Sequence, residues 1–353
     1  MKMYITGGAK CGKSTLAQDT AIALSARDGV PRYYIATMQP ADAEDESRIR
    51  RHIADRDGLD FLTIEQPRHL SALCETDSFQ PEAVYLVDSV TALLANEMFG
   101  KEGTDKHAGD RVAEDLLRFA AGVRHAVFVS DGIYSDAALY DDLTLCYREA
   151  LARIDRALAS HCDTVAECVY GQIRYLKGSG LTDDKAVFPK RFSLPETHQK
   201  SGTEQRREDR GMDRDNVQGK IFVFGGAFQG KCTCVRETFG LRDADIASCA
   251  EDSTTLPADA RCICHAERYV LACVRQGLQP EAEAFFSGNT DIVICDDISA
   301  GIVPVDPVLR KWREETGILM RKLSAEADSV IRVVAGIPVP MKTDAPDAGC
   351  GQH

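Results

Sequence analysis

The chain carries the same glycine-rich pattern twice, and this repetition constrains its fold more than any other feature. Residues 4–15 read YITGGAKCGKST, residues 222–233 read FVFGGAFQGKCT, and the two align without a gap. The ends of the halves also correspond, since residues 171–177 (GQIRYLK) match residues 336–342 (GIPVPMK). From loop to end, the first half spans 167 positions and the second 114, a shortfall of 53. The sequence therefore predicts a tandem duplication with a deletion in the second copy.

The first loop satisfies the pattern G-x-x-x-x-G-K-[ST] and predicts a phosphate-binding site. Its glycines let successive backbone N–H groups point at a phosphate, and the helix expected after it adds its positive end. In such loops the lysine reaches the β- and γ-phosphates and the hydroxyl that follows it holds Mg²⁺. The alternative, a glycine-rich turn without a ligand, is disfavoured because a strand precedes the loop and a helix follows it. The residues assigned to nucleotide binding here are Gly7, Gly8, Ala9, Lys10, Cys11, Gly12, Lys13, Ser14 and Thr15.

Apolar runs and helical patterns alternate along the first half of the chain. Such alternation predicts an α/β fold of the P-loop NTPase type, with a mainly parallel sheet, flanking helices and two homologous units. Strands are expected at residues 3–6, 32–37, 82–87, 125–130 and 164–169, and helices at residues 14–27, 41–57, 90–99 and 143–160.

Composition sets the domain limits. At about 150 residues per domain, a chain of 353 residues is expected to hold two domains. Residues 196–219 contain six acids, five bases and almost no large apolar side chain, which predicts a flexible linker; a surface loop within one domain is the alternative. We therefore expect a first domain over residues 1–190, a shortened second domain over 220–342, and a disordered tail over 343–353.

Charge and cysteine content exclude several classes of protein. The net charge of −13 argues against a broad nucleic-acid-binding face, although a local loop can still bind a small anion. The 13 cysteines, an odd number without a Cys-x-x-Cys pair, suggest reduced thiols in a cytoplasmic protein. No apolar run is long enough for a membrane span, and the first residues lead directly into the glycine loop, so no signal peptide is expected.

Two further patterns extend the expected nucleotide site. Asp88 follows a buried run and suits the acid that helps to hold the metal with Ser14, although a helix N-cap is an alternative role for it. The second pattern joins residues 34–37 (YIAT) to a basic segment around His52. An isolated exposed histidine usually has no chemical role, but histidine can act as a nucleophile toward phosphorus, and arginines stabilise phosphoryl oxygens.

Four segments together resemble one family, the bifunctional adenosylcobinamide kinase/adenosylcobinamide-phosphate guanylyltransferases. They are the loop GGAKCGKS, the strand YIAT, residues 48–56 (RIRRHIADR) and residues 88–96 (DSVTALLAN). The resemblance implies that His52 forms a covalent GMP intermediate. It also implies that Lys13 is catalytic and that the nucleotide contacts Thr37, Arg48, Arg56, Glu65 and Asp88. The last third of the family pattern is found in the second half instead, at residues 296–304 (DDISAGIVP), with Arg313 and Gly317 downstream.

The two copies depart from the family pattern in different places. Copy one has residues 130–135 (SDGIYS) where the family has its N-E-V-G run, and copy two lacks both the YIAT strand and the R-I-x-x-H segment. Copy two also has Cys232 where Ser or Thr would hold Mg²⁺, and a thiol is a poor ligand for a hard cation. Either the copies complement one another, or copy two is a structural or regulatory domain. The second-copy candidates are Gly225, Gly230, Lys231 and Asp297.

The sequence Cys262-x-Cys264-His265 permits a metal site, but its spacing is not that of common zinc folds. A partly buried helix with reduced thiols is the favoured interpretation.

These observations lead to one functional hypothesis and two alternatives. The chain is expected to phosphorylate adenosylcobinamide and then to transfer GMP from GTP through His52, with Mg²⁺ as cofactor and with ATP and GTP as substrates. The expected partners are the corrinoid and the nucleotide, without nucleic acid or membrane, and the units could pair within one chain or in a homo-oligomer. The alternatives are a P-loop kinase without guanylyl transfer and a non-catalytic nucleotide-binding regulator.

Overall fold

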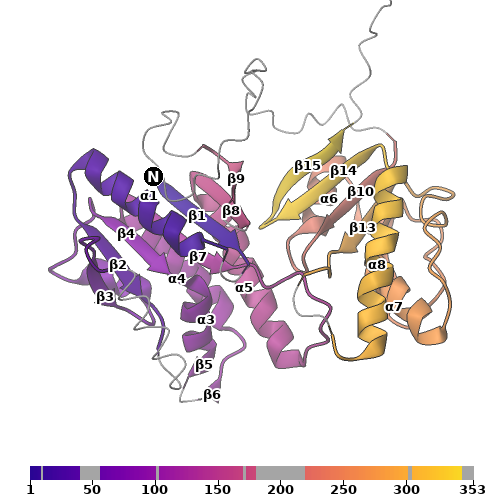
Figure 1. Cartoon of the computed structure of the whole chain (residues 1–353), viewed down its shortest axis with the longest axis horizontal. Coiled ribbons are helices and arrows are strands. Elements are labelled where there is room, and N and C mark those ends of the chain that lie inside the picture. The colour runs from indigo at the N-terminus through magenta and orange to yellow at the C-terminus, as the bar shows by residue number, and fades with distance from the viewer. Residues whose placement is uncertain are drawn as a thin grey trace, which may run out of the picture. The chain divides into compact units, whose positions relative to one another are not determined.

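The computed structural model describes residues 1–8, 11–39, 56–100, 103–169, 172–179, 219–300 and 304–343. The chain divides into two compact units (Figure 1). Unit 1 comprises Met1–Ile133 and Tyr140–Glu196, and unit 2 comprises Tyr134–Leu139 and Thr197–His353. A short segment of the first half therefore belongs to unit 2. The linker predicted at 196–219, apart from Gly219, and nearly all of the helix predicted at 41–57 lie outside the described residues.

Unit 1 is built on a sheet of seven strands in the order β3-β2-β4-β7-β1-β8-β9. All neighbouring pairs are parallel except β8 and β9, which form an antiparallel edge. The mainly parallel sheet predicted from the alternating pattern is confirmed. The strands are β1 (Lys2–Gly7), β2 (Arg32–Ala36), β3 (Leu62–Glu65), β4 (Val84–Asp88), β7 (His125–Asp131), β8 (Thr164–Val169) and β9 (Gln172–Lys177).

Helices cover both faces of this sheet because its central strands are apolar on both sides. Helix α1 (Lys13–Asp28) packs its apolar stripe against Met3 and Ile5 of β1 and against side chains from β4 and β7. Helix α5 (Asp142–His161) contacts β1, and α3 (Val90–Met98) contacts β7. The remaining elements of unit 1 are α3 (Val90–Met98), the hairpin β5 (Phe99–Gly100) with β6 (Gly103–Thr104), α4 (Ala108–Gly122), α5 (Asp142–His161) and the 3₁₀ helix η1 (Leu70–Glu75).

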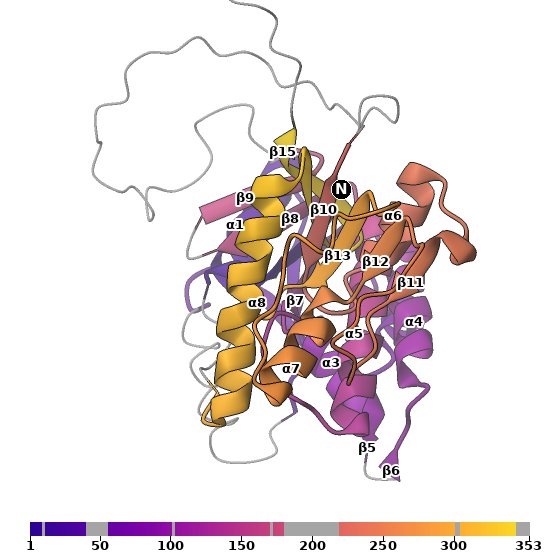
Figure 2. The same cartoon turned by 90° about the vertical axis from the view of Figure 1, so that its right-hand side faces the viewer.

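Unit 2 repeats this plan in a shorter form, with six strands in the order β11-β12-β13-β10-β14-β15. Figure 2 shows β10, β13, β12 and β11 side by side. Alternate residues of β10 face two cores: Ile221 and Val223 pack toward α6, whereas Phe222 packs with side chains of α7 and α8. The elements are β10 (Ile221–Gly225), α6 (Lys231–Phe239), η4 (Asp243–Asp245), β11 (Ile246–Ser248), β12 (Cys262–Cys264), α7 (Ala266–Gln276), β13 (Ile292–Asp296), α8 (Pro307–Glu326), β14 (Ser329–Val334) and β15 (Ile337–Thr343).

Two expectations for the second copy need correction. The segment Cys262–Cys264 is a buried strand, not part of a helix, because its backbone pairs with both β11 and β13. The copy also keeps a short strand, β11, at the place in the sheet that β2 occupies in unit 1, although the YIAT residues are absent. The deletion has thus removed the counterpart of β3 from the described part of the sheet, while the strand next to it is retained.

Candidate functional site

The loop after β1 adopts a conformation that requires glycine at two positions. Gly7 has φ 156°, and a Cβ placed on it would lie 2.3 Å from the carbonyl oxygen of Cys168, so no side chain fits there. Gly12 has φ 101° and stands immediately before α1. Cys11 is buried, and its carbonyl oxygen accepts a hydrogen bond from the Cys168 thiol at 3.0 Å. The loop is therefore anchored on β8; Ala9 and Lys10 lie outside the described residues.

Lys13 is buried at the start of α1, with 7% of its side chain exposed. Its Nζ atom donates to the carbonyl oxygens of Gly7 at 3.0 Å and Gly8 at 2.6 Å. It also forms an ion pair with Asp131 Oδ1 at 2.9 Å. An ammonium group has three donors, and these three oxygens hold it beneath the loop.

Asp131 is a site residue that the sequence analysis did not single out. It ends β7, the strand that pairs with β1, and its Cα is registered with that of Gly7. Its backbone N–H donates to the Thr91 hydroxyl at 3.0 Å, which ties the strand end to α3. The signal that could have found it was its position: an acid directly after a buried strand, as for Asp88.

Ser14 and Thr15 lie in the first turn of α1, and both are half-buried. No side chain caps this helix end, so the first backbone N–H groups remain available to an anion. Ser14 supplies a hydroxyl oxygen and Asp88, at the end of β4, a carboxylate oxygen. Both are the hard oxygen ligands that Mg²⁺ prefers, and their chemistry fits that ion.

Asp88, Tyr34 and Arg56 form a cluster at the carboxyl ends of β2 and β4. The Tyr34 hydroxyl donates to Asp88 Oδ2 at 3.3 Å, and the Arg56 guanidinium lies 3.5 Å from the centre of the Tyr34 ring. Burial, together with the Asp88 carboxylate, raises the pKa of Tyr34, so the hydroxyl remains a donor. Arg56 is 8% exposed, and its Nη1 atom has no hydrogen-bond partner among the described residues. A buried cation with an unused donor is suited to bind an anion.

Thr37 connects β2 to β4, and it is fully buried. Its hydroxyl both donates to the Ser89 carbonyl oxygen and accepts from the Ser89 N–H, each at 2.8 Å. The hydroxyl is thus engaged with the chain itself. Ser89, and not Asp88, is the N-cap of α3, since its side chain accepts from the Ala92 N–H at 3.3 Å. Glu65 is exposed at the end of β3, beside Ala36 in the register.

The carboxyl ends of parallel strands meet at one edge of a sheet, and this edge collects the predicted residues that the structure describes. Lys13 and Asp131 lie together there, and Asp88 lies with Arg56 two strands away in the order β4-β7-β1. The predicted nucleophile His52 and its neighbour Arg48 lie outside the described residues. Their roles remain predictions.

Unit 2 also contains a buried lysine–aspartate pair, but its aspartate is Asp296 and not the adjacent Asp297 that the sequence predicted. Lys231 Nζ, 6% exposed, forms an ion pair with Asp296 Oδ1 at 2.6 Å and donates to the Gly226 carbonyl oxygen at 2.6 Å. Asp296 is registered with Gly225, as Asp131 is with Gly7. Asp297, the residue expected from the sequence, instead accepts from the Ser299 N–H at 3.0 Å. Gly230 precedes α6 with φ 85°, as Gly12 precedes α1.

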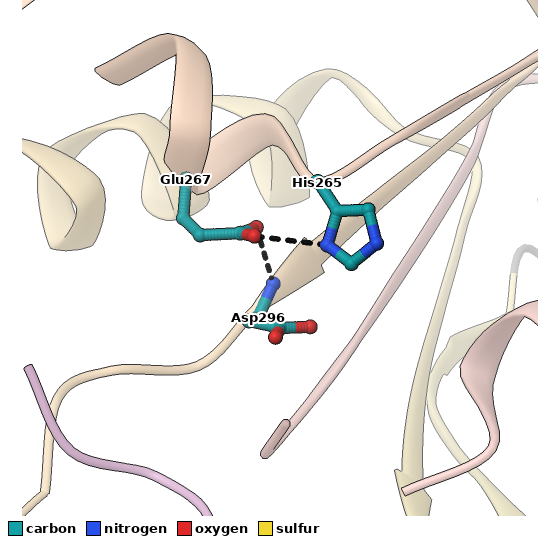
Figure 3. Close-up of side chains that lie close together, drawn as sticks. All are labelled: His265, Glu267 and Asp296. Atoms are coloured by element: carbon teal, nitrogen blue, oxygen red, sulfur yellow. Dashed lines mark hydrogen bonds and ion pairs between the residues drawn. The ribbon is translucent and has the colours of Figure 1, made fainter. Parts of the chain in front are cut away.

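Two further side chains, His265 and Glu267, gather beside Asp296 of this pair (Figure 3). Donor atoms of His265, Glu267 and Asp296 lie within 4.8 Å of one another. Glu267 contacts His265 Nδ1 at 3.0 Å and accepts from the Asp296 N–H at 2.9 Å. Burial opposes protonation of His265, but Glu267 and Asp296 outweigh it and raise the pKa of the imidazole.

Comparisons with known proteins identify relatives of the chain. The family model for cobinamide kinase / cobinamide phosphate guanyltransferase matches residues 3–176 and 263–341, one segment in each unit. The bifunctional adenosylcobalamin biosynthesis protein CobP of Pseudomonas aeruginosa is 30% identical over 182 residues, 51% of this chain and 100% of that protein. The corresponding CobU of Salmonella typhimurium is 30% identical over 184 residues, 48% of this chain and 97% of that protein. CobU of Escherichia coli is 36% identical over 103 residues, 29% of this chain and 53% of that protein.

Proposed function

Because the chain belongs to the cobinamide kinase / cobinamide phosphate guanyltransferase family, we propose that it is a transferase acting twice on one corrinoid. The first reaction phosphorylates adenosylcobinamide, and the second transfers GMP from GTP to adenosylcobinamide phosphate. Both belong to the assembly of the nucleotide loop in cobalamin biosynthesis. The observation that carries the proposal is the loop of unit 1, where buried Lys13 is held by Asp131 beneath an uncapped helix end.

In the first reaction, the oxygen of the corrinoid's terminal hydroxyl bonds to the γ-phosphorus of ATP or GTP and gives its proton to solvent. The bond from that phosphorus to the bridging oxygen breaks, and the nucleoside diphosphate leaves. All three donors of Lys13 are engaged, so an arriving phosphate must replace at least one of them. The bond to Gly8 is only partly buried and is the one we expect to exchange. Lys13 and the first N–H groups of α1 then stabilise the charge on the phosphoryl oxygens. Mg²⁺ held by Ser14 and Asp88 would add further positive charge there.

In the second reaction, we propose His52 as the nucleophile. A neutral imidazole nitrogen bonds to the α-phosphorus of GTP, the bond to the bridging oxygen breaks, and pyrophosphate leaves. A phosphate oxygen of the corrinoid then attacks the same phosphorus, which breaks the N–P bond, returns the free imidazole and yields the GDP-linked product. Arg48 and Arg56 would stabilise the phosphoryl oxygens, and the unused Nη1 donor of buried Arg56 supports this role.

Labelling with α-³²P-GTP tests the covalent step. The wild-type chain should retain label after denaturation, and the His52→Ala variant should not. His161→Ala is the matched control, because His161 is an exposed histidine at the end of α5 and should leave labelling unchanged. Label retained by His52→Ala would refute the assignment of the nucleophile.

A product assay with adenosylcobinamide and GTP separates the two reactions. Lys13→Ala should lose both the phosphorylated and the GDP-linked products, whereas His52→Ala should lose only the second. GTP binding without any corrinoid turnover in the wild type would favour the non-catalytic alternative. Phosphorylation without guanylyl transfer would favour a kinase alone. A cytoplasmic location, expected from the reduced thiols and the nucleotide substrates, is part of this proposal.

A further inference from the structure

The register of the two sheets shows which residues of unit 2 stand at the positions that are proposed to bind Mg²⁺ in unit 1. Asp88 pairs with Val129, two residues before Asp131. In unit 2, β12 pairs with β13 as β4 pairs with β7, and Ile263 is registered with Val293. The next residue, Cys264, is thus level with the residue two before Asp296 and is the equivalent of Asp88.

The other position is given by the loop. Ser14 follows Lys13 at the start of α1, and Cys232 follows Lys231 at the start of α6. Both oxygen ligands expected in unit 1 are therefore thiols in unit 2. Sulfur is a soft ligand that binds Mg²⁺ poorly and binds zinc well.

The thiols lie together in the structure, although they are 32 residues apart in the sequence. The Sγ atoms of Cys232 and Cys264 are 3.5 Å apart, and those of Cys262 and Cys264 are 3.9 Å apart. Cys262 and Cys264 are completely buried in the core beneath α6, and Cys232 is half-buried. A tetrahedral zinc site with Zn–S bonds of about 2.3 Å has sulfur–sulfur edges of about 3.8 Å, which the two separations from Cys264 bracket. The Sγ atoms of Cys232 and Cys262 do not lie within 4.8 Å of one another, so one of these side chains must turn for all three thiolates to bind one ion.

Another segment of unit 2 packs against the second loop, and this contact disfavours phosphate binding there. The Ala227 N–H, which would otherwise face a ligand, donates to the Tyr134 carbonyl oxygen at 2.8 Å. A Cβ on Gly226 would lie 2.7 Å from both Tyr134 Cβ and Ser135 Oγ. The segment Tyr134–Leu139, which belongs to unit 2, thus packs directly on the loop.

We propose that Cys232, Cys262 and Cys264 bind one zinc ion, at the place equivalent to the one where Ser14 and Asp88 would hold Mg²⁺ in unit 1. Each thiol gives its proton to solvent as it becomes a thiolate ligand, so three protons are released for each ion bound. This zinc site is separate from the proposed transferase activity, and zinc binding can be tested without measuring that activity.

The cluster of His265, Glu267 and Asp296 is the competing location for a metal. Its members are already satisfied, since Glu267 bonds to His265 and to the Asp296 backbone, while the Asp296 side chain pairs with Lys231. Glu267 also takes the role that Thr91 has in unit 1, where the hydroxyl accepts from the Asp131 N–H. We therefore assign the cluster a structural role.

Zinc binding by the full chain tests the proposal. Protein purified with a phosphine reductant and stripped by a chelator is dialysed against Zn²⁺, desalted and assayed by elemental mass spectrometry. We expect about one zinc per wild-type chain and a loss of most of it in Cys232→Ser and Cys264→Ser. Cys234→Ser should retain it, because this thiol lies in the same helix and faces Thr238 instead.

Substitution with Co²⁺ supplies a readout of the ligands themselves. Thiolate ligation should give charge-transfer absorption in the near ultraviolet that disappears in Cys232→Ser. Trp312, the single tryptophan of the chain, lies in unit 2. Its fluorescence emission verifies that this unit is folded in each variant. Absence of zinc from folded wild-type protein would overturn the proposal. Zinc that survives both cysteine substitutions but is lost in His265→Ala would also overturn it and would place the metal in the competing cluster.

Discussion

At the scale of single residues, the two loops use the same device to hold a lysine. Lys13 and Lys231 are both buried, and each pairs with an aspartate at the end of the strand next to the loop strand. Charged side chains are rarely buried without a partner, because the loss of hydration is costly. The aspartates therefore explain why the loops keep their lysines in place without a ligand.

Substitution of Asp131 tests this device. Asp131→Asn removes the charge that positions Lys13, and we expect GTP affinity to fall about tenfold, or about 1.4 kcal/mol, since the ion pair is partly exposed. Isothermal titration calorimetry measures the change. Asp296→Asn removes the same charge in unit 2 and should leave GTP affinity unaltered; equal losses in both variants would contradict the assignment of the site to unit 1.

His125 is predicted to make the stability of unit 1 depend on pH. Its ring is buried beside Asp28 and the N-terminal amine, and burial lowers the pKa of the imidazole below its usual value of 6.5. The folded state therefore binds fewer protons than the unfolded state once the pH falls below about 6.5, and stability is lost there as the pH decreases. Above that pH both states are neutral and the contribution is constant.

His125→Gln should flatten this dependence. The thermal unfolding midpoint is followed by far-ultraviolet circular dichroism between pH 7.5 and pH 5.5. As the pH is lowered, this midpoint should fall less for the variant than for the wild type. The side chain of Asp28 titrates at lower pH, because its bonds to Arg27 and His125 lower the pKa of its carboxyl group, and so it does not interfere. Identical slopes would show that His125 does not carry the effect.

At the scale of elements, most of unit 1 could be predicted from the sequence. Five of the seven strands of its sheet (β1, β2, β4, β7 and β8) and the helices α1, α3 and α5 follow from apolar runs, helical spacing and the loop motif, whereas β3 and β9 were not predicted. Helix α4 was not predicted, although Val112, Leu116 and Phe119 lie on its buried side at helical spacing. The strand β12 was mistaken for a helix because a three-residue strand between polar loops has no measurable period, and its pairing partners are distant in the sequence.

Equivalent glycines of the two loops should respond differently to the same substitution. A Cβ on Gly8 meets no heavy atom within 4 Å, whereas one on Gly226 collides with Tyr134 and Ser135. Gly226→Ala should therefore destabilise unit 2 by about 1–3 kcal/mol through overpacking. Denaturation followed by Trp312 emission measures this loss, and Gly8→Ala should leave that transition unmoved. A neutral Gly226→Ala would show that the segment Tyr134–Leu139 does not pack tightly on the loop.

At the scale of the whole molecule, the chain is a duplicated P-loop protein whose copies have diverged in chemistry. Unit 1 keeps the hydroxyl of Ser14 and the carboxylate of Asp88, and unit 2 has thiols at both positions. The family model matches a segment in each unit, but the second segment begins at residue 263, beyond the second loop. Among the described residues, none of the helices combines the length and the apolar character that crossing a membrane requires.

The divergence predicts one nucleotide for each chain. Equilibrium dialysis with a non-hydrolysable GTP analogue should give a stoichiometry near one. Among the described residues, Ser14 and Asp88 of unit 1 offer oxygen ligands, whereas unit 2 has thiols at both positions and its Ala227 N–H is bonded to Tyr134. Lys13→Ala should abolish this binding and Lys231→Ala should preserve it. Two nucleotides per chain, with one lost in each variant, would show that unit 2 has kept its site.

The sequence by itself was sufficient to predict the glycine loop, the α/β fold, the duplication and the family. Each of these is recognised from patterns of residues that lie close together in the chain. Tertiary structure alone decided that Asp131 and Asp296 face the lysines, that Cys232 meets Cys264, and that Tyr134–Leu139 belongs to unit 2. The reason is that strand order and register choose neighbours across the sheet. Periodicity within a strand carries no information about which strand will lie beside it.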